Sequence, residues 1–196
     1  TGLVCWMFLG SLSSTLNVVL AIPMSLLGTV AFIYFAGFTL NTFTLLALGL
    51  AVGIVVDDAI MVLENIYRHR EQGEGKVKAA SVGAREITFA AAATTLAIVA
   101  IFLPVAFLKG IIGKFFFQFG VTISVAVLIS LLEALTLAPM RCSQFLEVEH
   151  RGRLGQVVDR VFTRLSELYL KALGPVLRNR GRVLAGSLAF FLLSLL

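Results

Sequence analysis

Two adjacent carboxylates inside a long apolar segment constrain this chain more than any other feature of its sequence. Asp57 and Asp58 lie within residues 42–67, a run that is long enough to cross a bilayer and carries no other charge before Glu64. A charged side chain in the hydrocarbon core costs about 3 kcal/mol even on the lenient insertion scale. Two such residues side by side indicate a proton or cation site, and we interpret them as a proton relay.

Two glycines share a helix face with the first of these acids. Gly49, Gly53 and Asp57 are spaced four residues apart, so they line one face, and Asp58 lies about 100° further round the helix. Small residues allow a second helix to approach closely. We therefore predict helix packing at the glycines, beside a carboxylate pair that faces a central pathway or a cationic partner. The alternative is that both acids lie near the end of a shorter helix and reach water.

The composition agrees with a membrane protein. Hydrophobic residues make up 59% of the chain, and its mean hydropathy of +0.98 is far above that of soluble domains. The apolar runs predict an all-α helical bundle in a lipid bilayer, with full spans at residues 16–36, 42–67, 86–108 and 115–139. Short or polar stretches at residues 10–15, 37–41 and 109–114 are predicted to be turns, and residues 68–85 are predicted to be an exposed loop with a short helical portion.

Basic residues are confined to two regions of the chain. None of the 16 Lys and Arg residues precedes Arg68, and 14 of them fall within residues 68–85 and 141–182. Cytoplasmic loops of membrane proteins are rich in Lys and Arg, so we predict that both regions are cytoplasmic. No folded soluble domain with a basic face is visible, so nucleic acid is not an expected partner.

The predicted spans contain no cation that could pair with the aspartates. Arg68 is the nearest along the chain, eleven residues and about 16 Å of helix beyond Asp57. That separation is too long for a contact ion pair. We therefore expect the basic partner of Asp57 and Asp58 to lie outside this chain.

A different kind of helix is predicted after the last full span. In residues 154–173, apolar residues recur with the i, i+3, i+4, i+7 spacing, and basic residues fall between them. This pattern is typical of an amphipathic helix on the cytoplasmic membrane surface, although a helix packed on another domain is the alternative. We divide the chain into transmembrane helices at 1–146, a cytoplasmic segment at 147–182, and the start of a further span at 183–196.

One more acid lies inside a predicted span. Glu133 is on the same side of its helix as Ser130 and Thr136, two turns before Pro139. We interpret it as a structural acid that bonds to a neighbouring helix or reaches the cytoplasmic interface. A role in a proton exit route is the alternative, although no spacing ties Glu133 to either aspartate.

Cysteine and histidine do not indicate a metal or a cofactor. Cys5 and Cys142 form no disulfide framework and no ligand spacing. His69 and His150 fall in polar stretches without a Cys or His companion, so we predict surface histidines. Protons as the coupling ion are the only small species that the sequence leads us to expect.

Three stretches carry a resemblance to a known family. GLAVGIVVDDAIMVLENIYRHRE at residues 49–71 resembles the fourth-helix signature of the resistance–nodulation–division (RND) transporters. FLPVAFLKGIIGKFFFQFGVTI at residues 102–123 and ALTLAPMRCSQFL at residues 134–146 agree in place and order. The resemblance implies the end of the second to the start of the seventh helix of the amino-terminal half of a transporter.

The resemblance also implies a function and partners. In that family the paired aspartates take up protons and a lysine of the other half pairs with them, so Asp57 and Asp58 are expected to drive a proton/substrate antiporter. The DDAI form is similar to exporters of hydrophobic and amphiphilic compounds, whereas the heavy-metal branch usually keeps one acid here. A homotrimer in the bacterial inner membrane, with a periplasmic adaptor and an outer-membrane channel, is implied as well.

Other classes fit these residues less well. An intramembrane aspartyl protease needs its two acids on separate helices, and a membrane prenyltransferase needs a third acid in a DDxxD run that binds magnesium. Adjacent Asp57 and Asp58 satisfy neither requirement. A purely structural membrane scaffold is the remaining non-transport alternative, and the cost of the two acids argues against it. We therefore predict a transporter and no enzyme.

Overall fold

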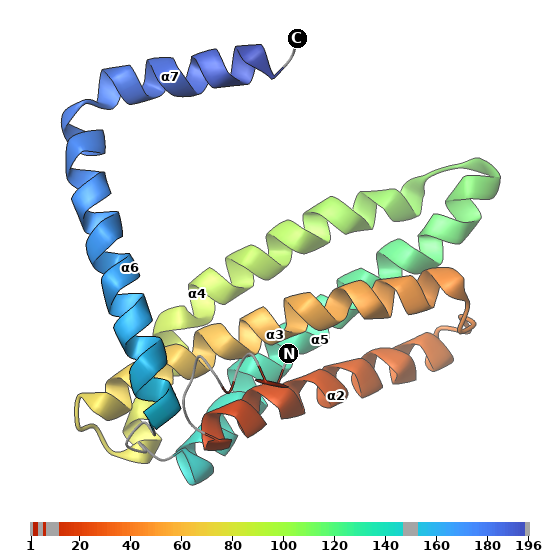
Figure 1. The fold of residues 1–196 in the computed structure, drawn as a ribbon. Coiled ribbons are helices and arrows are strands. Elements are labelled where there is room, and N and C mark those ends of the chain that lie inside the picture. The colour runs from red at the N-terminus through yellow and green to blue at the C-terminus, as the bar shows by residue number, and fades with distance from the viewer. Residues whose placement is uncertain (1, 4–5, 7–11, 147–152, 195–196) are drawn as a thin grey trace. The chain divides into compact units, whose positions relative to one another are not determined.

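The computed structural model describes residues 2–3, 6, 12–146 and 153–194, and their regular structure is helical throughout. In order, the elements are α2 (Leu12–Phe35), α3 (Thr42–Glu71), α4 (Lys76–Phe102), the short 3₁₀ helix η1 (Leu103–Phe107), α5 (Gly110–Phe145), α6 (Arg153–Arg178) and α7 (Arg180–Leu193) (Figure 1). Four stretches are long and apolar enough to cross a membrane, namely Ser13–Phe35, Thr42–Glu71, Lys76–Phe107 and Gly110–Phe145. The predicted all-α membrane bundle is confirmed.

The chain forms two compact units, Thr1–His150 and Arg151–Leu196. In the first unit, α3 and α5 pack against each other, and each also packs against α2 and α4. Figure 1 shows α2 and α4 on the two sides of this central pair. The connections are short, so helices that follow one another in sequence are antiparallel.

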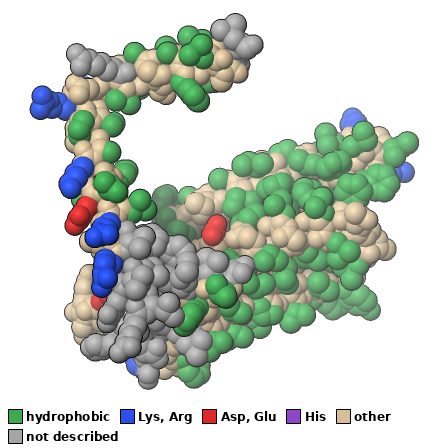
Figure 2. Space-filling view, viewed as in Figure 1, with side chains coloured by type: hydrophobic (Ala, Val, Ile, Leu, Met, Phe, Trp, Pro, Cys, Tyr) green, Lys and Arg blue, Asp and Glu red, His purple; other side chains and the backbone are tan. Residues whose placement is uncertain are grey.

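The two ends of this bundle differ in chemistry. We call the end that holds the start of α2, residues 72–75 and the end of α5 the basic end. Its cations are Arg68, Arg70, Lys76, Lys78, Arg85 and Arg141. At the opposite, aromatic end, the rings of Phe43 and Phe115 stack with centroids 5.2 Å apart, and Asn41 caps α3 and donates to Gln118. Figure 2 shows hydrophobic side chains along the bundle and basic side chains near its α4–α5 connection.

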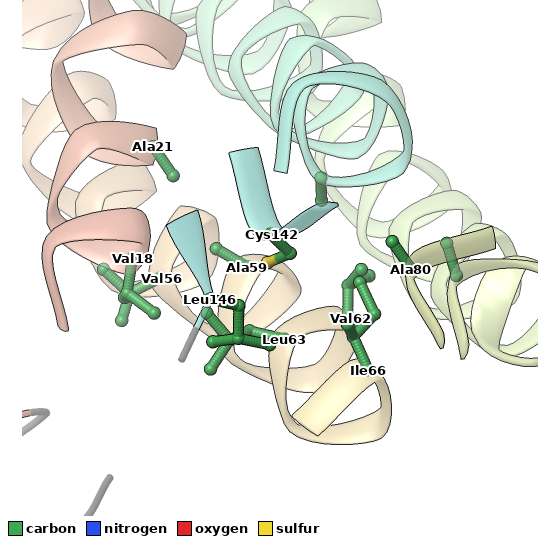
Figure 3. Close-up of a cluster of buried hydrophobic side chains, with 12 residues drawn as sticks. Val18, Ala21, Val56, Ala59, Val62, Leu63, Ile66, Ala80, Cys142 and Leu146 are labelled. Carbon is green, nitrogen blue, oxygen red and sulfur yellow. The ribbon is translucent and has the colours of Figure 1, made fainter. Parts of the chain in front are cut away.

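A buried apolar cluster joins all four long helices in the half of the bundle next to the basic end. Small residues let the helices approach closely, for example at Gly83, where an added Cβ would lie 2.9 Å from Ile66 Cα. The cluster consists of Val18, Ala21, Val56, Ala59, Val62, Leu63, Ile66, Ala80, Ala84, Ala134, Cys142 and Leu146 (Figure 3).

The polar stretch at residues 68–85 is mostly helical, so the prediction of an exposed loop with only a short helical portion is wrong. α3 continues to Glu71 and α4 begins at Lys76. The turn is confined to residues 72–75, where Gly73 adopts a φ of +89° that favours glycine. The polar side chains of the two helix ends pair with one another, and these contacts let both helices extend beyond their apolar runs.

The predicted turn at residues 10–15 is also wrong for its described part. α2 begins at Leu12, and Ser14 and Thr15 are buried. Ser13 Oγ donates a hydrogen bond of 2.5 Å to the carbonyl oxygen of Phe145 at the end of α5. Contacts with α5 stabilise the polar residues at this end of α2 as part of the helix. The helix therefore begins before the apolar run that the prediction used.

Helix α5 is longer at both ends than predicted. It begins at Gly110, which leaves only residues 108–109 outside the helices, and it continues through Pro139 to Phe145. A proline removes one backbone donor, and neighbouring helices make that tolerable inside a membrane bundle. At Pro104, by contrast, α4 gives way to the 3₁₀ helix η1, as expected where proline interrupts a helix.

The second unit consists of α6 and α7, which meet at Asn179. Leu165, Leu168, Tyr169 and Ala172 line one shallow apolar hollow on α6, and by helical spacing the charged residues between them lie on the other side. The predicted amphipathic helix is confirmed, and its place on a membrane surface stays a prediction. The domain division at 146 and 182 also stays a prediction, and residues 147–152 lie outside the described residues.

Candidate functional site

Asp58 lies on the side of α3 that packs against α5. The side chain is buried, with the residue 5% exposed. Its Oδ2 accepts a hydrogen bond of 2.8 Å from Ser130 Oγ on α5. The next residue, Ala59, belongs to the apolar cluster. A carboxyl in these surroundings has one protein donor and apolar neighbours.

Asp57 lies in different surroundings, although it is the preceding residue. It is exposed, as are Gly49 and Gly53 on the same face of α3. A Cβ built on either glycine would meet nothing outside the helix's own backbone within 4 Å. The described helices therefore leave this face of α3 open. Helix packing at Gly49 and Gly53 stays a prediction, because none of the described helices packs there.

The helices are longer than the predicted spans and carry cations near their ends. α5 extends beyond Pro139, so the membrane-length helix Gly110–Phe145 includes Lys114 and Arg141. Arg141 pairs with Glu133. Within the described ranges, no ion pair includes Asp57 or Asp58.

Glu133 forms a buried polar cluster with two residues that the sequence did not single out. It is 3% exposed, and Arg141 Nη2 donates to its Oε1. Arg141 also reaches α2, where its Nε donates to Asn17 Oδ1 (3.2 Å) and its Nη2 to the Asn17 carbonyl oxygen (3.3 Å). Long side chains in helices point back toward the amino terminus, and this direction is the signal that could have paired Arg141 with Glu133.

A second polar cluster ties α3 to α4 at the basic end. His69 is buried, so the predicted surface histidine is wrong, and its Nε2 lies 3.0 Å from Glu86 Oε2. Its Nδ1 lies 3.3 Å from Glu74 Oε2, at an angle outside that of a hydrogen bond. Asn65 Nδ2 donates to the Gly83 carbonyl oxygen (2.8 Å) and to Glu86 Oε2 (3.1 Å). The spacing of Asn65 and His69, four residues apart, could have indicated a shared polar face.

The described residues show no group of three or more potential metal ligands. Cys142 is buried within the apolar cluster, while Cys5 and His150 lie outside the described residues. The expectation of no cofactor other than protons stays an expectation.

Comparisons with known proteins place this geometry in a family context. The chain matches the AcrB/AcrD/AcrF family over residues 2–196. It is 43% identical over 194 residues to the multidrug resistance protein MdtC of Cronobacter sakazakii (strain ATCC BAA-894). The aligned region covers 95% of this chain and 19% of MdtC, so the chain spans about a fifth of the length of this relative.

Proposed function

Because this chain belongs to the AcrB/AcrD/AcrF family of RND efflux transporters, we propose that it is the proton-coupling part of a longer proton-driven exporter. The relative MdtC is named a multidrug resistance protein. With the DDAI form of the acid pair, this name favours hydrophobic or amphiphilic compounds as the substrates of the whole protein.

The observation that carries the proposal is the placement of the two acids on one membrane helix. Asp58 packs against α5 and accepts a hydrogen bond from Ser130, its one side-chain donor among the described residues. Asp57 is on the open face of the same helix. A carboxylate that faced lipid would have no compensating partner. We propose that a helix from another part of the transporter covers this face and brings a basic residue to the acids.

The mechanism follows from electrostatics. Apolar surroundings disfavour an ionised carboxyl, whereas a hydrogen-bond donor and a nearby cation favour it. A site between these opposing influences can bind and release protons during a transport cycle. Protonation replaces the attraction between acid and cation with a neutral contact, so the helices on the two sides of the open face change their packing. The exporter couples this two-state packing to its substrate-binding part.

We propose an orientation and partners on the same grounds. Residues 68–85 and 141–182 are placed in the cytoplasm, because the bundle has six cations at its basic end and only Lys109 and Lys114 at the other. The protein is then a multi-pass protein of the bacterial inner membrane. A homotrimer that works with a periplasmic adaptor and an outer-membrane channel is the proposed assembly.

Substitution of the acids in the whole transporter tests the proposal. Asp57→Asn and Asp58→Asn keep the side-chain size and remove the ability to bind a proton, so each is expected to abolish proton flux in proteoliposomes and drug resistance in cells. Glu64→Gln is the matched control, since Glu64 is an exposed acid of the same helix near the basic end. Near-normal proton flux in either aspartate variant, at normal membrane insertion, would remove that residue from the relay.

A further inference from the structure

The buried cluster of Glu133, Arg141 and Asn17 has no part in the mechanism proposed above. Its two charged side chains are 4% and 11% exposed, so both are well shielded inside the bundle. Arg141 bonds to Glu133 on its own helix and to two atoms of Asn17 on α2. Together with the bond from Ser13 to Phe145, these contacts tie α5 to α2 along the basic half of the bundle.

The cluster lies one helical turn from the donor of Asp58. Ser130 and Glu133 are three residues apart on α5 and therefore share a face of that helix. Ser130 donates to Asp58, while Glu133 is held through Arg141 to α2. A rotation or shift of α5 about its axis would move both residues together. The contacts that hold Glu133 in place thus also set the position of the Ser130 hydroxyl.

The opposite pair of helices has its own polar connection. Asn65 and His69 of α3 contact Glu86 of α4, and Asn65 also contacts the Gly83 carbonyl oxygen. The Ser130–Asp58 hydrogen bond therefore joins a tied α2–α5 pair to a tied α3–α4 pair midway along the bundle. Small displacements between the two pairs would act directly on this bond.

Stability alone is a weak reason for such a cluster. A buried ion pair can often be replaced by apolar residues of similar size without loss of stability, because both charges must be desolvated. The contacts of Glu133 also differ from those of a proton carrier. Its described hydrogen-bond partner is Arg141, and it bonds to neither Asp57 nor Asp58 within the described residues. The cluster instead fixes the position of α5 along α2.

We propose that Glu133, Arg141 and Asn17 are positioning residues for the proton-binding carboxyl of Asp58. They hold α5 so that Ser130 Oγ stays within hydrogen-bond distance of Asp58. This inference rests on the proposed role of Asp58 as a proton-binding group.

The test uses the whole transporter and two readouts besides folded yield. The first is the infrared carbonyl stretch of protonated Asp58, identified by its disappearance in Asp58→Asn. The second is proton-coupled transport in proteoliposomes. The informative variant is the double substitution Glu133→Gln/Arg141→Met, because it removes both charges together and leaves no unpaired charge buried. Ser130→Ala supplies the reference spectrum for the lost hydrogen bond.

We expect the single variants Glu133→Gln and Arg141→Met to lower the folded yield, since each changes only one member of a buried pair. The double variant should fold with near-normal yield and still shift the Asp58 band in the same direction as Ser130→Ala. Its transport should fall about tenfold, the size expected for loss of one hydrogen bond to a charged group. Thr136→Val is the matched control on α5, because Thr136 is exposed and its hydroxyl bonds only to the Leu132 carbonyl oxygen. It should change neither readout.

An unshifted Asp58 band in the double variant would overturn the inference, whatever its transport rate. Loss of transport in Glu133→Gln at normal transport by Arg141→Met would also overturn it, because Glu133 would then act as a proton carrier. Normal transport by Asp58→Asn would contradict the proposed function itself. The failure of the proposed function and the failure of the positioning role are therefore distinguishable. Transport by Asp58→Asn tests the first, and the Asp58 band of the double variant tests the second in a transporter that requires Asp58.

Discussion

The two faces of α3 present adjacent acids to different surroundings. On the covered face, Asp58, Val62 and Ile66 are buried against the other helices of the chain. On the open face, Gly53 and Asp57 are exposed, and a Cβ added to Gly53 would meet no described atom of another helix within 4 Å. Consecutive residues of a helix point about 100° apart, so a step of one residue is enough to separate an acid inside the bundle from an acid at its surface.

The difference separates the contacts that the described helices make among themselves from the face on which we propose that a partner helix packs. Large apolar side chains are exposed elsewhere on the bundle, for example Leu27 and Phe89, and a bilayer satisfies these. Lipid chains offer a carboxylate no hydrogen-bond donor and no cation. Glycines favour close packing of a second helix and give no such advantage against lipid. The open face of α3 is therefore distinguished from the lipid-facing surface by Asp57 and by the two glycines beside it.

The largest effect is expected on the open face. Gly53→Leu should reduce proton-coupled transport of the whole transporter nearly as much as Asp57→Asn, because leucine would hold the partner helix away and a Coulomb interaction weakens with distance. Folded yield should be unchanged, since an added Cβ would meet no atom of the other described helices within 4 Å. Gly53→Ala, a much smaller addition, is the control and should keep most of the activity. Full activity of Gly53→Leu would mean that this face meets lipid.

A smaller effect, on stability and not on transport, is expected where α4 packs against the covered face of α3. Gly83→Ala places a Cβ 2.9 Å from Ile66 Cα, so overpacking should cost about 1–3 kcal/mol of stability. Thermal unfolding of the detergent-solubilised transporter should show a lower Tm, with transport per folded molecule nearly unchanged. Gly75→Ala is the matched control, because its added Cβ has no neighbour within 4 Å. An unchanged Tm for Gly83→Ala would contradict the close approach of α3 and α4.

The smallest effect is expected at the basic end. His69→Gln keeps a polar side chain near Glu86, and the bond from Asn65 to Glu86 remains. The Tm of the whole transporter should therefore fall by less than in Gly83→Ala. Arg68→Gln removes only an exposed ion pair with an N···O distance of 3.6 Å and should leave the Tm unchanged. A larger loss in Arg68→Gln than in His69→Gln would show that the buried histidine does not tie α3 to α4.

The amino-acid sequence by itself determined the fold class, the order of the helices and the carboxylate pair. Apolar runs of membrane length specify spanning helices locally, since a backbone in hydrocarbon must satisfy its own hydrogen bonds. The helix ends were less predictable. Residues 68–71 and 13–15 are polar and were assigned to loops or turns, and Arg141 was placed beyond the last predicted span. All of them are helical, and several of their side chains find partners on neighbouring helices or turns.

Only the tertiary structure decided which surroundings each acid has. The 3.6-residue period predicts that Asp57 and Asp58 point in different directions, but it does not say which of them meets α5. The same limit applies to His69 of α3, whose partner Glu86 lies on α4. Helical periodicity is a property of one segment, whereas burial and pairing depend on how distant segments are rotated against one another. That rotation follows from the packing of Ala59, Gly83 and Ala134 in the core, which is why Asp58 is covered and Asp57 is open.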